Sequence, residues 1–187
     1  MRDENPERFG AAIGAREVRF RRRLPGAVER VWTYLTDPDL RATWLAGGEM
    51  EPRGGGRMEL AFFHADLSPQ KAEPPERFRE MAEKGHRMAG TVLAWEPPRL
   101  LVITWGSKGE GPSEVSFELE ALGPDETLMT LTHRKLADPG EMANVGSGWH
   151  AHLAILEDRL AGRTPPSFWT VWEGLEAAYA RRFTEAA

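Results

Sequence analysis

Four consecutive short segments with strand-like patterns constrain the fold of this chain more than any other feature. They lie at 90–96, 100–105, 114–122 and 127–135, and are separated by Pro97-Pro98, a glycine-rich turn through Gly111, and Gly123-Pro124-Asp125. Segments of this length bounded by turn residues are typical of β-strands, and connections this short join antiparallel neighbours. The sequence therefore predicts an antiparallel meander.

Further strands and two short helices precede the meander. The patterns predict strands at 17–24, 49–53 and 58–64. Apolar residues at i, i+3, i+4 and i+7 predict an amphipathic helix at 28–35. Asp37 before Pro38 is a typical start of a second short helix, because Asp accepts hydrogen bonds from free backbone N–H groups and Pro needs none.

The last third of the chain changes to helical periodicity. An apolar stripe at i, i+4, i+7 and i+11 predicts a helix at 149–159, capped by Ser147, and the same spacing predicts a final helix from Phe168 to about Phe183. A helix with one apolar stripe needs an apolar partner, which one face of the meander provides. We therefore predict an α+β fold: a twisted antiparallel sheet of about six or seven strands wrapped around the long helix, with an extra C-terminal helix. The residues predicted to be buried are Trp149, Leu153, Leu156, Phe117 and Leu131.

The length of 187 residues is that of about one domain. Residues 1–15 have no consistent period and are expected to form a loosely attached arm, whereas 16–162 form the domain and 163–187 a helical extension of it. The aromatic residues at 168–172 are expected to dock on the domain rather than to form an external contact patch. Residues 66–87 are rich in proline and charge, which predicts an inserted, mobile flap near one end of the sheet, with a helical turn or two at 77–84.

The composition disfavours several classes of protein. The formal net charge of −5 argues against nucleic acid as a partner, because such affinity comes from phosphate neutralisation. The absence of cysteine excludes disulfides, thiolate nucleophiles and cysteine-ligated zinc. No apolar segment approaches the ~20 residues of a membrane span, and the N-terminal segment has no apolar leader core. We expect a cytoplasmic protein with no membrane span and no cofactor.

Alternate apolar residues on several strands, together with the apolar stripe of the long helix, predict one apolar interior. Residues of one parity on several strands face the same side, and the helix covers that side. Sequence alone leaves open whether this interior is packed solid or encloses a cavity. If it is a cavity, the residues predicted to contact a ligand are Met58, Leu60, Phe62, Trp105, Phe117, Met129, Leu131, His133, Trp149, His152 and Leu156.

The five histidines are the candidates for polar or acid–base roles. His133 has inward parity and His152 lies at the edge of the helix stripe, so both can face one cavity. Catalysis would need an orienting partner that the sequence does not show, and the alternative is a hydrogen-bonded core histidine. His150 and His152 point about 200° apart on a helix, so we expect no metal site. His64 ends a strand, where a polar rim or solvent is expected, and His86 is expected to be exposed.

The chain also resembles a known family. The segments TDPDLRATWL, GTVLAWEPPRLLVITW, SEVSFELEALGPDETLMTLTHRKL and GSGWHAHLAIL are similar to the family named for homology to the activator of heat-shock protein 90 ATPase. That family belongs to the START-like, birch-pollen-allergen-like helix-grip superfamily. The resemblance covers about residues 16–162, whereas the insertion at 66–87 and the tail after Pro165 depart from it. It implies a helix-grip fold with a ligand pocket between the sheet and the long helix.

Three functions follow as hypotheses. The first is non-catalytic binding of a small hydrophobic or lipid-like molecule in the cavity. The second is a cyclase-like or hydratase-like enzyme that uses the same pocket, as relatives in the wider superfamily do. The third is a co-chaperone-like contact with a heat-shock ATPase in the stress response, implied only by the name of the family. A homodimer is also left open.

Overall fold

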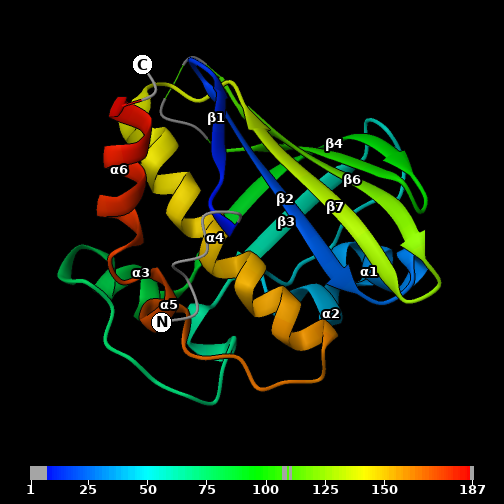
Figure 1. Ribbon diagram of the computed structural model, residues 1–187, viewed down its shortest axis with the longest axis horizontal. Helices are drawn as coiled ribbons and strands as arrows, with labels where there is room; N and C mark the ends of the chain where they lie inside the picture. The colour runs from blue at the N-terminus through cyan, green and yellow to red at the C-terminus, as the bar shows by residue number, and fades with distance from the viewer. Residues whose placement is uncertain (1–7, 107–108, 110, 186–187) are drawn as a thin grey trace.

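Seven strands form a single antiparallel sheet in the computed structural model, which describes residues 8–106, 109 and 111–185 (Figure 1). Every neighbouring pair of strands is antiparallel, so the predicted meander is confirmed. In hydrogen-bonded order the strands are β1 (Ala11–Gly14), β2 (Glu17–Pro25), β7 (Glu126–Arg134), β6 (Ser113–Gly123), β5 (Leu100–Trp105), β4 (His86–Glu96) and β3 (Arg57–Phe62).

The core lies between the sheet and the long helix α4 (Pro139–Leu160), around which the sheet curves (Figure 1). Phe117 on β6 pairs with Leu131 on β7, and both side chains are buried, as their shared parity predicts. Leu153 and Leu156 of α4 are also buried. The α+β architecture expected from the sequence is confirmed.

The α4 helix begins earlier than the apolar stripe indicates, so the prediction that Ser147 caps it is wrong. Its N-cap is Asp138, whose side chain accepts a hydrogen bond of 2.8 Å from the backbone N–H of Glu141. Pro139 follows at the first position, where its missing N–H costs nothing. Ser147 lies inside the helix and donates to the carbonyl of Ala143. The apolar stripe misplaced this end because the first turns of α4 contain small residues.

Two short helices, α1 (Val28–Thr36) and α2 (Pro38–Ala42), connect β2 to β3, and the Asp37 side chain caps α2 as predicted. The predicted strand at 49–53 is wrong. This segment makes only an isolated bridge between Met50 and Met58, because Pro52 lacks an N–H donor and glycines flank the segment.

The C-terminal region forms two helices, α5 (Phe168–Trp172) and α6 (Leu175–Glu185), where the sequence predicts one. Gly174 separates them with a φ of 79°, which a helix interior cannot accommodate. The α6 helix packs beside α4 (Figure 1), close to Gly146. There the Tyr179 hydroxyl accepts a 2.8 Å hydrogen bond from the backbone N–H of Gly10.

The segment expected to form a loose arm therefore contributes to the domain where it is described. Ala11–Gly14 forms edge strand β1, and Phe9 packs against the rings of His150 and Tyr179. Residues 1–7 of the expected arm lie outside the described residues. The docking follows from partners distant in sequence, which a local pattern of charge cannot reveal.

The segment between β3 and β4 contains a short 3₁₀ turn followed by helix α3 (Arg79–Lys84), near the predicted helical turns at 77–84. It is anchored at its start, where Leu67 and Ser68 are buried. The Ser68 hydroxyl donates a 2.7 Å hydrogen bond to the carbonyl of Pro165 in the tail. This segment therefore packs against the C-terminal extension, while its mobility stays a prediction.

Candidate functional site

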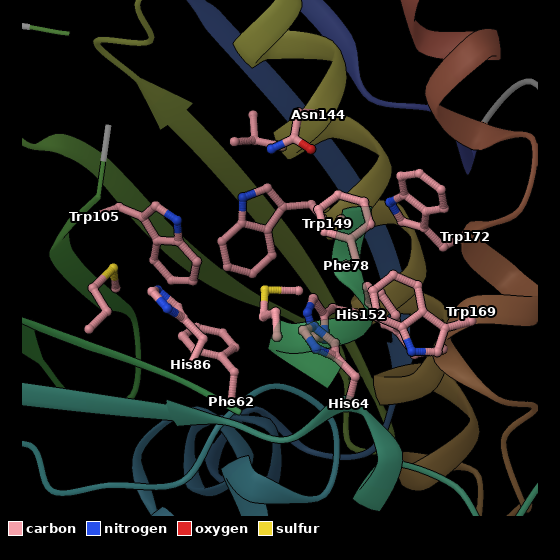
Figure 2. Close-up of a pocket in the computed structure, with 15 residues that line it drawn as sticks. Phe62, His64, Phe78, His86, Trp105, Asn144, Trp149, His152, Trp169 and Trp172 are labelled. Carbon is pink, nitrogen blue, oxygen red and sulfur yellow. The ribbon is translucent and has the colours of Figure 1, made fainter. Parts of the chain in front are cut away.

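A cavity of about 230 Å³ lies beside residues 144–152 of α4, between that helix, the ends of β3, β4 and β5, helix α3 and helix α5 (Figure 2). Four of its residues are tryptophans from three different parts of the chain. The full lining is Phe62, His64, Phe78, Met81, His86, Met88, Trp105, Asn144, Val145, Gly148, Trp149, His152, Phe168, Trp169 and Trp172. None of these lining residues carries an acidic side chain, a lysine or an arginine.

Gly148 helps to make the cavity because it leaves space on the surface of α4. A Cβ atom added at this position would meet no heavy atom within 4 Å. Trp149 and His152 lie on the same part of the helix, and their rings are 6.3 Å apart, measured between centroids. The helix thus contributes an indole and an imidazole to the lining of the cavity.

The roof of the cavity is built by the insertion and the tail together. Phe78 stacks on Trp169 and makes an edge contact with Trp172, each at 5.5 Å between ring centroids. Arg77 lies over Phe78, with Cζ 4.6 Å from the ring centroid, and its guanidinium pairs with the Glu176 carboxylate at 2.5 Å. Two segments that are remote in sequence therefore close the cavity on one side.

Behind Trp149, a buried hydrogen-bond chain fixes the wall of the cavity. Trp149 Nε1 donates to His133 Nδ1 at 3.0 Å. His133 Nε2 must then carry the ring proton, and it lies 2.8 Å from the Ser113 hydroxyl. Burial lowers the pKa of His133 to about 3, so its imidazole is neutral at pH 7 and serves to orient Trp149.

Two further histidines meet at the cavity itself (Figure 2). The rings of His64 and His152 are 5.4 Å apart between centroids, and Phe168 covers the His64 ring at 4.2 Å. Burial is the main reason that the pKa falls to about 4 for His64 and to about 3 for His152. His86 adds to the lowering of the pKa of His64, and His64 adds to the lowering of the pKa of His152. Both are therefore neutral at pH 7.

The structure separates the residues that the sequence grouped as one site. Phe62, Trp105, Trp149 and His152 line the cavity. The other seven pack in the core outside its lining, and all are buried: Met58, Leu60, Phe117, Met129, Leu131, His133 and Leu156. These seven side chains fill the interior next to the cavity, which lies along residues 144–152 of α4. A ligand-binding role for any of these residues stays a prediction.

Sequence reasoning did not assign the remaining lining residues to the site. His64 was expected at a rim or in solvent, yet it is buried because the tail covers it. His86 is exposed at the edge of the cavity. Phe78 and Met81 carried a weak signal, since they are apolar residues at helical spacing within a charged segment. Within the described ranges, no group of three or more His, Asp or Glu residues is arranged to hold a metal ion.

Comparison with known proteins places the chain in a family. Residues 26–161 match the family described as activator of Hsp90 ATPase homolog 1-like protein. The chain belongs to this family. A protein of Bordetella parapertussis, solved in solution by NMR, is 46% identical, with a TM-score of 0.79 over 92% of this chain and 89% of that one. No significant match was found among curated proteins.

Two more distant solved structures share the fold. The crystal structure of CalU16 from Micromonospora echinospora is 25% identical, with a TM-score of 0.65 over 94% of each chain. DynU16, from the dynemicin biosynthetic locus, is 20% identical, with a TM-score of 0.62 over 81% of this chain and 49% of that one. These likenesses and the sheet topology establish the helix-grip fold of the START-like superfamily.

The family match ends before the roof of the cavity is complete. Helices α5 and α6 follow residue 161, so Phe168, Trp169 and Trp172 lie outside the matched range. The range matched by the activator of Hsp90 ATPase homolog 1-like family therefore includes strands β3 to β7 and α4, but not β1, β2 or this part of the cavity. None of the helices in the described part of the chain is long and apolar enough to cross a bilayer.

Proposed function

We propose that this protein binds a small, mainly apolar molecule in the cavity beside residues 144–152 of α4, without chemical conversion. The observation that carries the proposal is the lining: aromatic and sulfur-containing side chains, three histidines, an asparagine and no formally charged residue type. A cavity of this kind gains affinity from burial of apolar surface, about 25 cal/mol per Å². A few polar groups then orient the ligand.

The two buried histidines fit this proposal better than acid–base catalysis. A general acid or base works best when its pKa lies near the operating pH. The pKa values of His64 and His152, about 4 and about 3, make both rings weak bases at pH 7 and leave neither protonated to act as an acid. The cyclase-like or hydratase-like alternative would need the bound substrate to raise one of these pKa values by several units.

A co-chaperone-like contact has less support from the described surface. The large apolar side chains that are more than a third exposed are Ile13, Phe63, Leu93 and Leu122, which come from four different segments. The tail aromatics that could have formed an external patch are instead turned into the cavity. The enclosed space therefore carries more of the functional argument than the outer surface.

The proposal is tested with naphthalene, an uncharged probe of about the size of the cavity. We expect naphthalene to quench tryptophan emission in the wild type, because four indoles line the cavity. Gly148→Leu should abolish saturable quenching, since the new side chain enters the open space. Ala177→Leu, which introduces the same side chain at an exposed position of α6, should bind as the wild type does. Equal binding by all three proteins would refute the assignment of the cavity.

A further inference from the structure

The hydrogen-bonding state of His152 is determined by its backbone partner. His152 Nδ1 lies 2.8 Å from the carbonyl oxygen of Trp44. A carbonyl oxygen only accepts, so Nδ1 carries a proton. With a pKa of about 3 the ring is neutral at pH 7, and Nε2 is left as a lone-pair acceptor.

This acceptor has no donor within the part of the chain that the structure describes. The Trp44 carbonyl is the only hydrogen-bond partner that His152 has there. The ring lines the cavity, so the free lone pair belongs to the site rather than to the packed core. An unsatisfied acceptor in such surroundings favours a ligand that brings a donor.

His64, the neighbouring ring, supplies the complementary group. Neither of its ring nitrogens is hydrogen-bonded to another described residue, and the neutral ring carries one N–H and one lone pair. A hydroxyl group donates one hydrogen bond and accepts others. One hydroxyl oxygen placed between His64 and His152 can therefore satisfy both imidazoles.

The absence of acidic side chains, lysine and arginine from the lining argues against ionised ligands. A carboxylate would meet the lone pair of His152 and would find no lysine or arginine among the lining residues. An ammonium group would find no acidic side chain there, and burial of an unpaired charge is costly. The ligand that fits is uncharged at its polar end.

The walls and the volume restrict the rest of the ligand. Trp105 and Trp149 face the space from one side and Trp169 and Phe78 from the other (Figure 2), which favours a flat aromatic molecule. An apolar protein cavity of about 150 Å³ is large enough for benzene. A cavity of about 230 Å³ therefore suits one ring or two fused rings.

We propose that the preferred ligand class is an uncharged, one-ring or two-ring aromatic molecule with a hydroxyl group that donates its hydrogen bond to His152 Nε2. This inference rests on the proposed function and adds the polarity of the ligand to it. It assigns His152 as the acceptor and His64 as the donor to the same oxygen.

The test compares three ligands of nearly equal shape by calorimetry at pH 7: 2-naphthol, 2-methoxynaphthalene, which can only accept, and naphthalene. The wild type should bind 2-naphthol about tenfold more tightly than 2-methoxynaphthalene, as expected for about one buried hydrogen bond. In His152→Leu the affinities for these two ligands should converge while naphthalene still binds. Ala177→Leu should keep the wild-type ratio.

The ligand series decides the question even if His152→Leu does not fold. Equal affinity of the wild type for 2-naphthol and 2-methoxynaphthalene would overturn the inference, as would tighter binding of 2-naphthoate than of 2-naphthol. Naphthalene binding that is lost in Gly148→Leu would still uphold the proposed function. Failure of naphthalene to bind would instead remove the proposed function itself.

Discussion

Phe78 and Trp169 stack across the top of the cavity with their ring planes 24° apart, although one belongs to the insertion and the other to the tail. Trp172, from the same helix as Trp169, adds an edge contact to Phe78 at 5.5 Å between ring centroids. The stack therefore couples the position of the insertion to that of α5.

Loss of this stack should loosen the insertion. We expect Phe78→Ala to increase the rate at which trypsin cleaves between residues 66 and 87, because the segment loses its main apolar contact with the tail. The wild type should also be cut first in this region, at exposed Lys71. Glu83→Ala, an exposed change in the same segment, should leave the rate unchanged. Resistance of this segment equal to that of the strands would show that it is a rigid part of the domain.

Gly146 and Gly148 should respond in opposite directions to the same substitution. A Cβ atom at Gly146 would lie 3.0 Å from the Tyr179 ring, so Gly146→Ala should destabilise the protein by about 1–3 kcal/mol through overpacking. Gly148→Ala meets open space and should stabilise it by up to about 1 kcal/mol through helix propensity. Urea unfolding of both variants checks the signs. A stable Gly146→Ala protein would mean that α6 can move away from α4.

The packed part of the interior predicts a large cavity cost at Leu156. Its side chain is fully buried between the sheet and α4, so Leu156→Ala should lower the free energy of unfolding by about 2–5 kcal/mol. Leu122→Ala, at a 37% exposed position of β6, should change it by about 0.5 kcal/mol or less. Thermal melts followed by circular dichroism measure both. Equal melting temperatures for the two variants would contradict the placement of α4 on the sheet.

Stability should fall as the pH is lowered from about 6.5. The pKa of an unperturbed histidine is 6.5, whereas burial lowers it to about 4 in His64 and to about 3 in His133 and His152. Between these values the unfolded chain binds more protons than the folded chain, so acid favours unfolding. Each histidine contributes a slope of about 1.4 kcal/mol per pH unit near pH 5.

His64→Phe isolates one of these contributions, because His64 has no hydrogen bond to another described residue that the variant would lose. Between pH 7 and pH 5, urea unfolding should show a loss of stability smaller by about 2 kcal/mol in total than that of the wild type. Glu157, whose pKa is raised mainly by burial, acts in the opposite direction in both proteins and cancels in the difference. Identical slopes would show that His64 titrates normally in the folded state.

The strands and α4 could be predicted because their signals are local. Parity placed Phe117 and Leu131 on the buried face, and turn residues set the limits of the meander. The apolar stripe does not extend to the start of α4, where Asp138-Pro139 is the stronger local signal of a helix N-terminus. The break at Gly174 carried a similar local signal.

The cavity could not be predicted to the same extent because it depends on contacts between distant segments. Phe168 of the tail covers His64. His133 on strand β7 orients Trp149 on helix α4. Parity identified Met58, Leu60 and Met129 as buried but could not show that they lie outside the lining of the cavity. Whether a face is packed or open depends on the volumes of all the opposing side chains.

The joint roof has an evolutionary consequence. Because Phe78 and Trp169 stack on each other where they line the cavity, we expect the insertion and the tail to be inherited together. Relatives that differ in one of these segments are expected to differ in the other. Exchange of ligand preference between relatives should therefore require transplanting both segments at once, whereas the sheet and α4 can remain those of the recipient.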